Sequence, residues 1–121
     1  MRGNTGRSSA KKGAQGERDV LRFFRDRGYS PRRAGTKIFG AMPDVFGVEG
    51  LHLEVKQCEK LQLPAWIRQS ERDAAAFCDG VATVVFRQSG EPWRIVMRLE
   101  DIMHFYMKVY PPSESEIKED P

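Results

Sequence analysis

The segment from residue 51 to residue 57 alternates between apolar and polar side chains, and this pattern constrains the fold more than any other feature of the sequence. In an extended strand, its apolar members fall on one face and its polar members on the other. The apolar residues are Leu51, Leu53 and Val55, and the polar residues are His52, Glu54 and Lys56. A second strand, expected over residues 44–48, would pair with it through a tight turn at Glu49-Gly50.

Other periodic segments complete an α/β arrangement. Apolar side chains recur at helical spacing in three segments, which predict helices over residues 14–27, 63–79 and 99–110. Three further segments predict strands, over parts of residues 29–38 and over 81–87 and 93–98. The β-branched run at 81–87 favours an interior strand. The order α-β-β-β-α-β-β-α predicts a mixed sheet flanked by helices, with the apolar stripe of the last helix either in the core or on a dimer surface.

The length of 121 residues suits one domain. We expect it over residues 14–110, between a disordered basic arm at 1–13 and a disordered acidic tail at 111–121. Apolar runs are too short for a membrane span, and residues 1–13 lack the pattern of a secretory signal. Cys58 and Cys78 are too few for a disulfide framework, so we expect two reduced thiols in a cytoplasmic protein.

Three carboxylates and a lysine are placed where they can meet. Glu54 and Lys56 leave the same face of one strand, and Asp44 begins the strand expected beside it. Two adjacent carboxylates repel unless a cation lies between them, and oxygen ligands of this kind suit Mg²⁺. Glu17 lies beside the apolar stripe of the first helix and faces the same sheet. The pattern therefore predicts a metal-assisted hydrolytic site.

Each of these residues also has an ordinary structural interpretation. Glu54 and Lys56 are compatible with a solvated strand face that carries a salt bridge. Asp44 is compatible with a turn after Met42-Pro43, and Glu17 with a helix acid favoured by the dipole. For His52 a structural or solvent-facing role is favoured over a general base. The joint occurrence of the four residues in this order of elements favours the catalytic interpretation.

The same residues resemble the PD…(D/E)xK nuclease superfamily, and within it the branch of the Holliday junction resolvases. The resemblance extends from about Lys12 to Tyr110. Several short segments carry it: Gly16-Glu17-Arg18, Arg32-Arg33, Pro43-Asp44-Val45, His52-Leu53-Glu54-Val55-Lys56, and Pro92-Trp93 leading to Met97-Arg98-Leu99-Glu100-Asp101. The Pro92-Trp93 segment and the segment from Met97 to Asp101 resemble phage-encoded members of the branch.

The resemblance implies a restriction-endonuclease-like fold and a metal site. Asp44 and Glu54 would bind Mg²⁺, or Mn²⁺ in its place, together with the main-chain carbonyl of Val55. Glu17 would complete that site, and Lys56 would be the catalytic lysine.

A glutamine near the lysine is also implied by the resemblance. Gln69, in the helix after the Glu-x-Lys strand, matches it, while Gln57 and Gln62 remain alternatives.

Basic residues could hold the DNA backbone, because phosphate contacts come largely from arginine and lysine. Our candidates are Lys11, Lys12, Arg32, Arg33 and Lys37. The cluster at residues 32–37 is equally compatible with an exposed loop.

The sequence thus predicts a metal-dependent DNA endonuclease, and the resemblance narrows this prediction to a phage-type Holliday junction resolvase. Such an enzyme would act as a homodimer on branched DNA, in a phage-infected or other prokaryotic cell, without a membrane partner. The alternatives are a nuclease for duplex ends, flaps or linear DNA, a non-catalytic DNA-binding module with the same fold, and a structural or assembly protein.

Overall fold

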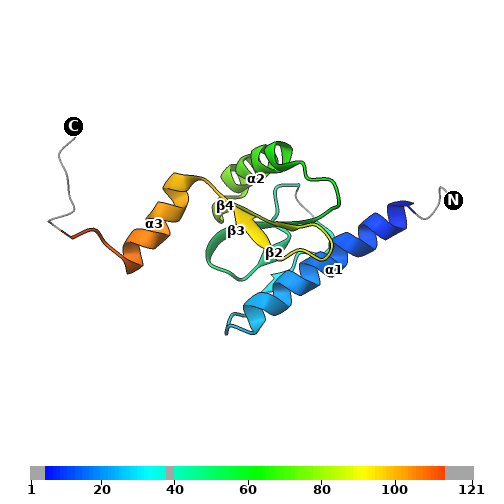
Figure 1. Ribbon diagram of the computed structural model, residues 1–121, viewed down its shortest axis with the longest axis horizontal. Coiled ribbons are helices and arrows are strands. Elements are labelled where there is room, and N and C mark those ends of the chain that lie inside the picture. Colours follow the sequence, from blue (N-terminus) through cyan, green and yellow to red (C-terminus); the bar gives the residue numbers. More distant parts are fainter. Residues whose placement is uncertain (1–4, 38–39, 114–121) are drawn as a thin grey trace.

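The described part of the chain folds into one five-stranded mixed sheet with two helices packed on it and a third that projects away (Figure 1). This computed structural model describes residues 5–37 and 40–113, and the side chains of residues 12–37 and 40–113. In chain order the elements are α1 (Thr5–Arg25), β1 (Arg32–Arg33), β2 (Val45–Phe46), β3 (Gly50–Gln57), α2 (Leu63–Phe77), β4 (Gly80–Arg87), β5 (Arg94–Val96) and α3 (Leu99–Val109). This order and the mixed sheet are those predicted from the sequence, which confirms the fold class.

The strands lie in the order β1-β2-β3-β4-β5, so β3 is the central strand. β3 and β4 are parallel, and α2 makes the crossover between them; the other neighbouring pairs are antiparallel. Val45 of β2 pairs with Leu53 of β3. This register places Asp44, the residue before Val45, opposite Glu54. A two-residue turn at Glu49-Gly50 alone would instead place Val45 opposite Glu54, so the observed pairing is shifted by one residue from that of the predicted hairpin.

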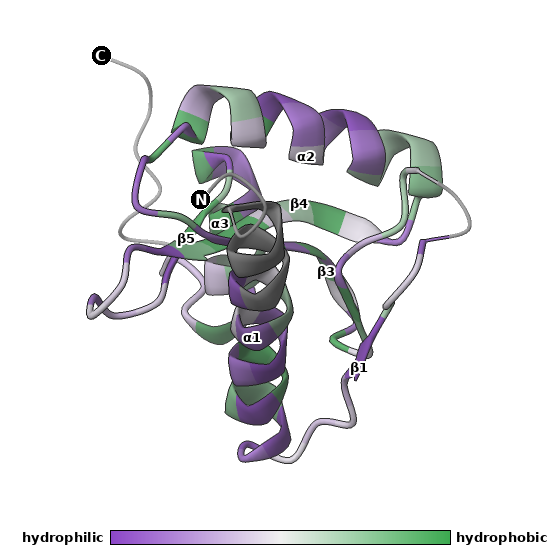
Figure 2. Cartoon of the chain, turned by 90° about the vertical axis from the view of Figure 1, so that its right-hand side faces the viewer, coloured by the Kyte–Doolittle hydropathy of each residue, from purple (hydrophilic) through white to green (hydrophobic). Residues whose placement is uncertain are grey.

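The two faces of the sheet are covered by different helices (Figures 1 and 2). On one face, Val20 of α1 packs in a cluster with the apolar side chains of β3. On the other face, Trp66 of α2 packs with Val84 and Phe86 of β4. Figure 2 shows both hydrophilic and hydrophobic residues along α1 and α2, as expected of helices with one buried side. The predicted alternation in β3 thus separates two cores.

Helix α1 begins at Thr5, so the predicted start at Ala14 is wrong. Its polar, basic sequence predicts a disordered arm, yet residues 5–13 contain no proline, and the helix continues through Gly6 and Gly13. Gly16 is buried in α1, and a Cβ there would lie 3.1 Å from Gln57 Oε1 and 3.3 Å from Trp93 Cη2. A glycine at this position therefore lets α1 approach the end of β3. Residues 1–4 and 114–121 of the predicted arm and tail lie outside the described residues.

Helix α2 ends at Phe77, before the predicted end at residue 79. Cys78 takes the left-handed C-cap conformation, with φ 59°, and its N–H donates to Ala74. Gly80 instead begins β4, where a Cβ would lie 2.4 Å from the carbonyl carbon of Gly50. Glycine is needed here because the starts of β3 and β4 approach closely.

Two smaller expectations concern the cysteines and the membrane. Cys58 and Cys78 form no disulfide and are both free thiols, as predicted. None of the helices in the described ranges has the length and apolarity needed to span a bilayer.

Candidate active site

The carboxylates of Asp44 and Glu54 converge on one cationic group, the ammonium of Lys37. Lys37 Nζ lies 2.8 Å from Asp44 Oδ1 and 3.6 Å from Glu54 Oε2. Glu54 is only 3% exposed, so its charge must be compensated by neighbouring groups. Asp44 and Glu54 come from neighbouring strands, and their register across β2 and β3 brings them together.

The backbone of β3 fixes the orientation of Asp44. Val55 N–H donates a hydrogen bond to Asp44 Oδ2 at 2.7 Å, and Asp44 N–H donates to the carbonyl of Leu53 at 2.8 Å. The side chain therefore continues the pairing of β2 with β3 by one residue. Because Oδ2 is held by the backbone, Oδ1 is the oxygen that faces Lys37.

A buried histidine holds Glu54 from the other side. The His52 side chain has no exposed surface, and its Nε2 lies 3.0 Å from Glu54 Oε1. Its Nδ1 lies 2.6 Å from Oδ1 of Asp79, at the end of the α2–β4 connection. An ionised carboxylate can only accept a hydrogen bond, and a neutral imidazole has only one N–H to donate. For both ring nitrogens to donate to Glu54 and Asp79, the three groups together must therefore bind one additional proton. Glu54 thus presents Oε1 to His52 and Oε2 to Lys37.

The pKa values in this cluster follow from burial and charge. Burial raises the pKa of Glu54 above its ordinary value, and the hydrogen bond to His52 offsets only part of that effect. Burial lowers the pKa of His52, but the contacts with Glu54 and Asp79 outweigh burial, so the pKa is raised overall. For Lys37, likewise, burial is outweighed by Asp44 and Glu54, and the pKa is raised. The cluster therefore favours protonated His52 and charged Lys37.

Glu17 lies near this cluster but binds a different partner. Arg33 Nε donates to Glu17 Oε1 at 3.1 Å. Burial and the negative charge of Asp44 raise the pKa of Glu17, while Arg33 lowers it by less. The electrostatic coupling with Asp44 places Glu17 at the edge of the site. Its predicted role as a metal ligand stays a prediction.

Lys56 leaves β3 on the same face as Glu54. It is half-buried and makes no hydrogen bond or ion pair with any residue that the structure describes. Its ammonium group is therefore available to a ligand. Gln69, on α2, is half-buried and has no described contact that ties it to Lys56, and Gln62 is exposed just before α2. The Oε1 atom of Gln57 is buried without a hydrogen-bond partner in the described structure.

The residues predicted to bind DNA are mostly paired with acids of the chain itself. Lys12 Nζ lies 3.0 Å from Glu59 Oε1, while Arg33 and Lys37 have the partners given above. Arg32 is exposed over the Phe46 ring. The side chain of Lys11 lies outside the described residues. The predicted DNA contacts of these residues stay predictions.

Sequence reasoning missed Asp79 and placed Lys37 on the DNA rather than among the carboxylates. One signal could have found Asp79. A crossover from β3 through α2 to a parallel β4 returns the chain to the start of β3, so the residue before β4 lies beside the first residues of β3. A histidine at a position that becomes buried, such as His52, then requires a nearby acceptor.

The site fits a hard divalent cation with two protein carboxylates. Asp44 and Glu54 already direct oxygens at one cationic position, which the Lys37 ammonium takes in this structure. Across the described ranges, no group of three or more His, Cys, Asp or Glu side chains is arranged to hold a metal ion, so Glu17 does not join the pair here. Mg²⁺ needs only one or two protein carboxylates, because water and substrate phosphate supply its other ligands.

Comparison with solved structures finds the same fold in a Holliday junction resolvase. The structure of Hjc, a Holliday junction resolvase from the archaeal hyperthermophile Archaeoglobus fulgidus, superposes with a TM-score of 0.54 at 25% sequence identity. The match covers 71% of this chain and 72% of that one. No protein-family model and no curated protein matches the sequence. The chain therefore has the Holliday junction resolvase-like version of the restriction-endonuclease-like fold, as the resemblance of its motifs implied.

Proposed function

We propose that this protein is a metal-dependent endonuclease that hydrolyses phosphodiester bonds in branched DNA. The observation that carries the proposal is the convergence of Asp44 and Glu54 on one cationic position, with Lys37 Nζ 2.8 Å from the first and 3.6 Å from the second. Lys56, which has no hydrogen-bond or ion-pair partner among the described residues, leaves the same face as Glu54. This combination suits phosphoryl chemistry, where catalysis depends on positioning and on compensating negative charge.

Asp44 and Glu54 would hold the metal through Oδ1 and Oε2, because their other oxygens are fixed by Val55 N–H and His52. When bound, Mg²⁺ or Mn²⁺ supplies positive charge to the phosphodiester and acidifies water. Fixed carboxylates keep the two ligand oxygens in place without a loss of side-chain freedom on binding.

Lys56 would contact the scissile phosphate or the attacking water. Its ammonium is a compact charge that stabilises negative charge as it develops on phosphate oxygens. Glu17 and Arg33 would form the rim of the site, where Arg33 can exchange its bond to Glu17 for one to a DNA phosphate.

Branched DNA is the proposed substrate because the fold matches that of a protein described as a Holliday junction resolvase. A four-way junction is resolved by cutting two strands, and each chain carries one Asp44–Glu54 pair. We therefore propose that two copies act together. The assignment to phage-type enzymes, drawn from the Pro92-Trp93 and Met97-Arg98-Leu99-Glu100-Asp101 segments, stays a prediction.

The test is a panel of labelled DNA substrates incubated with Mg²⁺, with Mn²⁺ or with EDTA. It contains a four-way junction, a flap, a nicked duplex and a linear duplex. We expect cleavage with either metal, none with EDTA, and the highest rate on the junction. Preference for flaps or ends would favour the alternative nuclease, and binding without any cleavage would favour a non-catalytic module.

Glu54→Gln is the diagnostic variant, since it removes charge from the site at almost constant volume. Glu49→Gln makes the same change at an exposed turn residue and serves as the matched control. We expect cleavage to fall by at least about 100-fold in the first variant only, the loss typical of a lost electrostatic contact to the transition state. Equal rates in both variants would refute the site.

A further inference from the structure

Helix α3 projects away from the sheet and from the other helices (Figure 1). None of its residues is buried, and it makes no extensive contact with another described helix or strand. Isolated helices shorter than about 12–15 residues are marginal in water, and α3 has 11. Seven large apolar side chains of α3 and the residue after it are each at least 40% exposed: Leu99, Ile102, Met103, Tyr106, Met107, Val109 and Tyr110. We call this set the α3 stripe.

The α3 stripe is as large as one side of a protein interface. At roughly 150–250 Å² for a large side chain, exposures of this size leave on the order of 700 Å² uncovered. Monomers rarely expose apolar patches larger than ~300–600 Å². Each partner in a standard-size interface contributes about 800 Å². The stripe is therefore large enough to hold two protein chains together.

The stripe contains no charge. At 3.6 residues per turn, Asp101 and Lys108 fall on the opposite side of α3 from Tyr106, and Glu100 falls at the edge of the stripe beside Met107. A nucleic acid would need cations on the contacting face, because its affinity comes largely from phosphate contacts. The stripe therefore suits an apolar protein surface and not a nucleic acid.

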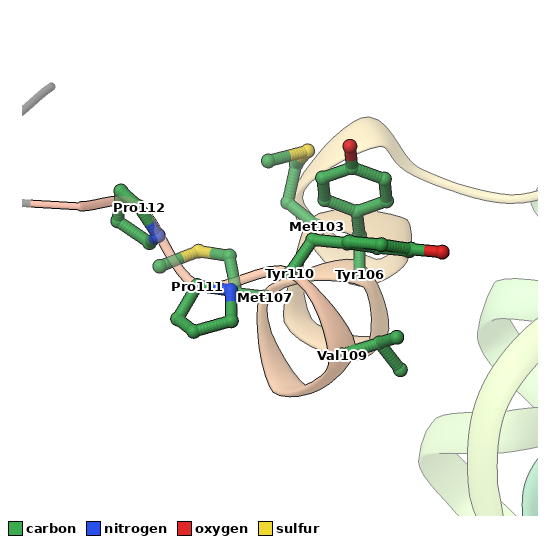
Figure 3. Close-up of a pocket in the computed structure, with 7 residues that line it drawn as sticks. All are labelled: Met103, Tyr106, Met107, Val109, Tyr110, Pro111 and Pro112. Carbon is green, nitrogen blue, oxygen red and sulfur yellow. The ribbon is translucent and has the colours of Figure 1, made fainter.

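The two ends of the stripe are complementary to each other. At its C-terminal end, a hollow is lined by Tyr106, Val109, Tyr110 and neighbouring side chains (Figure 3). At its N-terminal end stands Leu99, which is 76% exposed, the highest value among the exposed large apolar residues. In an antiparallel pair of α3 helices, each Leu99 would face the hollow of the other copy. A two-fold axis makes both contacts at once, as isologous interfaces require.

We propose that α3 joins two copies of this chain, stripe against stripe and antiparallel, with Leu99 of each copy seated in the hollow of the other. This arrangement keeps the candidate active sites open. Phe105 of α3 lies at the start of β3, 3.8 Å from where a Cβ on Gly50 would be. Lys56 lies roughly 20 Å further along the strand at ~3.3 Å per residue. The role of this dimer in cutting two DNA strands rests on the proposed function. The test of the dimer itself needs neither DNA nor metal.

The test is the oligomeric state of the full chain, measured by sedimentation equilibrium without DNA or metal. We expect the wild type to be a dimer and Leu99→Glu to be a monomer, with Kd raised at least about 30-fold, as for an interface hot spot. A glutamate in the first turn suits the helix dipole, so α3 should remain folded. His104→Glu adds the same charge at an exposed position off the stripe and should leave the dimer intact.

A second pair of variants tests the antiparallel arrangement. Val109→Lys should also give a monomer, whereas Leu99→Glu and Val109→Lys combined in one chain should restore the dimer, because opposite charges then face each other across the two-fold axis. A monomeric wild type at about 100 μM, a dimer that persists in Leu99→Glu, or a double variant that stays monomeric would each overturn the proposal. Since cleavage is not measured, these results are independent of whether the chain is a nuclease.

Discussion

His52 Nε2 lies 3.0 Å from Glu54 Oε1, and both side chains are almost fully buried. The imidazole is held in turn by Asp79, 2.6 Å from Nδ1. A chain of three groups therefore fixes one oxygen of Glu54 and leaves the other for the cationic position beside Asp44. Replacing a group that orients a metal ligand in this way typically lowers metal affinity by about 10–100-fold.

The first prediction is that replacing His52 weakens metal binding. His52→Leu removes the donor to Glu54, so the carboxylate loses its fixed orientation. We expect affinity for Mn²⁺, measured by calorimetry without DNA, to fall by about 10–100-fold. His52→Gln can still donate from its amide near the position of Nε2 and should recover part of the affinity.

The comparison between these two variants separates positioning from general damage to the core. Both remove the imidazole and its contact with Asp79. If His52→Leu and His52→Gln bound Mn²⁺ equally well, the hydrogen bond to Glu54 would have no role in orienting the ligand.

A second prediction concerns the stability of the metal-free protein as pH changes. The pKa of His52 is raised above its ordinary value of 6.5 by Glu54 and Asp79, despite the burial that lowers it. The folded state therefore binds this proton more tightly than the unfolded state. The resulting stabilisation is complete below pH 6.5 and is lost as pH rises through the raised pKa.

Urea unfolding of the metal-free protein at a series of pH values measures this effect. The free energy of unfolding of the wild type should fall above pH 6.5, by at most about 1.4 kcal/mol per pH unit for one proton. His52→Gln has no proton to lose and should show a flatter profile. An identical slope in both proteins would contradict a raised pKa for His52.

The element order could be predicted from the sequence because it depends on local patterns. Alternation in residues 51–57 defines β3, and Glu49-Gly50 marks the turn before it. The register, with Val45 opposite Leu53, differs by one residue from that of a two-residue turn at this place. The helical arm at residues 5–13 could not be predicted in the same way. Its polar composition resembles that of a disordered tail, and only its continuity with α1 distinguishes it.

The partners of the site residues depend on long-range contacts, which no local pattern specifies. Lys37 comes from a loop and Asp79 from the far end of a crossover, yet both contact the Glu54 cluster. The polar face of β3 was also expected to be compatible with solvent, whereas His52 and Glu54 are buried. Whether a polar strand face is exposed to solvent depends on which other elements pack on it, and here α2 covers it.

A third prediction uses two replacements of Asp44. Asp44→Asn keeps an oxygen that can accept the hydrogen bond from Val55 N–H but loses the charge. Asp44→Leu loses both. We expect both variants to be inactive, while only Asp44→Leu is destabilised, by about 1–3 kcal/mol, because it leaves a buried donor unsatisfied. Cleavage assays and urea unfolding on both variants check this; retained cleavage by Asp44→Asn would show that its charge is not needed.

The last prediction is that Lys37 and a divalent metal compete for one position. The Lys37 ammonium compensates Asp44 and Glu54 in this structure, and a metal bound between the two carboxylates would displace it. Lys37→Met leaves the carboxylates to repel each other, so the metal-free variant should have a lower Tm than the wild type. Saturating Mg²⁺ should then raise the Tm of the variant by more than that of the wild type, because no ammonium has to leave and binding to the folded state stabilises it. Lys60→Met, at an exposed position, is the control and should respond as the wild type does. If Mg²⁺ raised the Tm of all three proteins equally, Lys37 would not occupy the metal position.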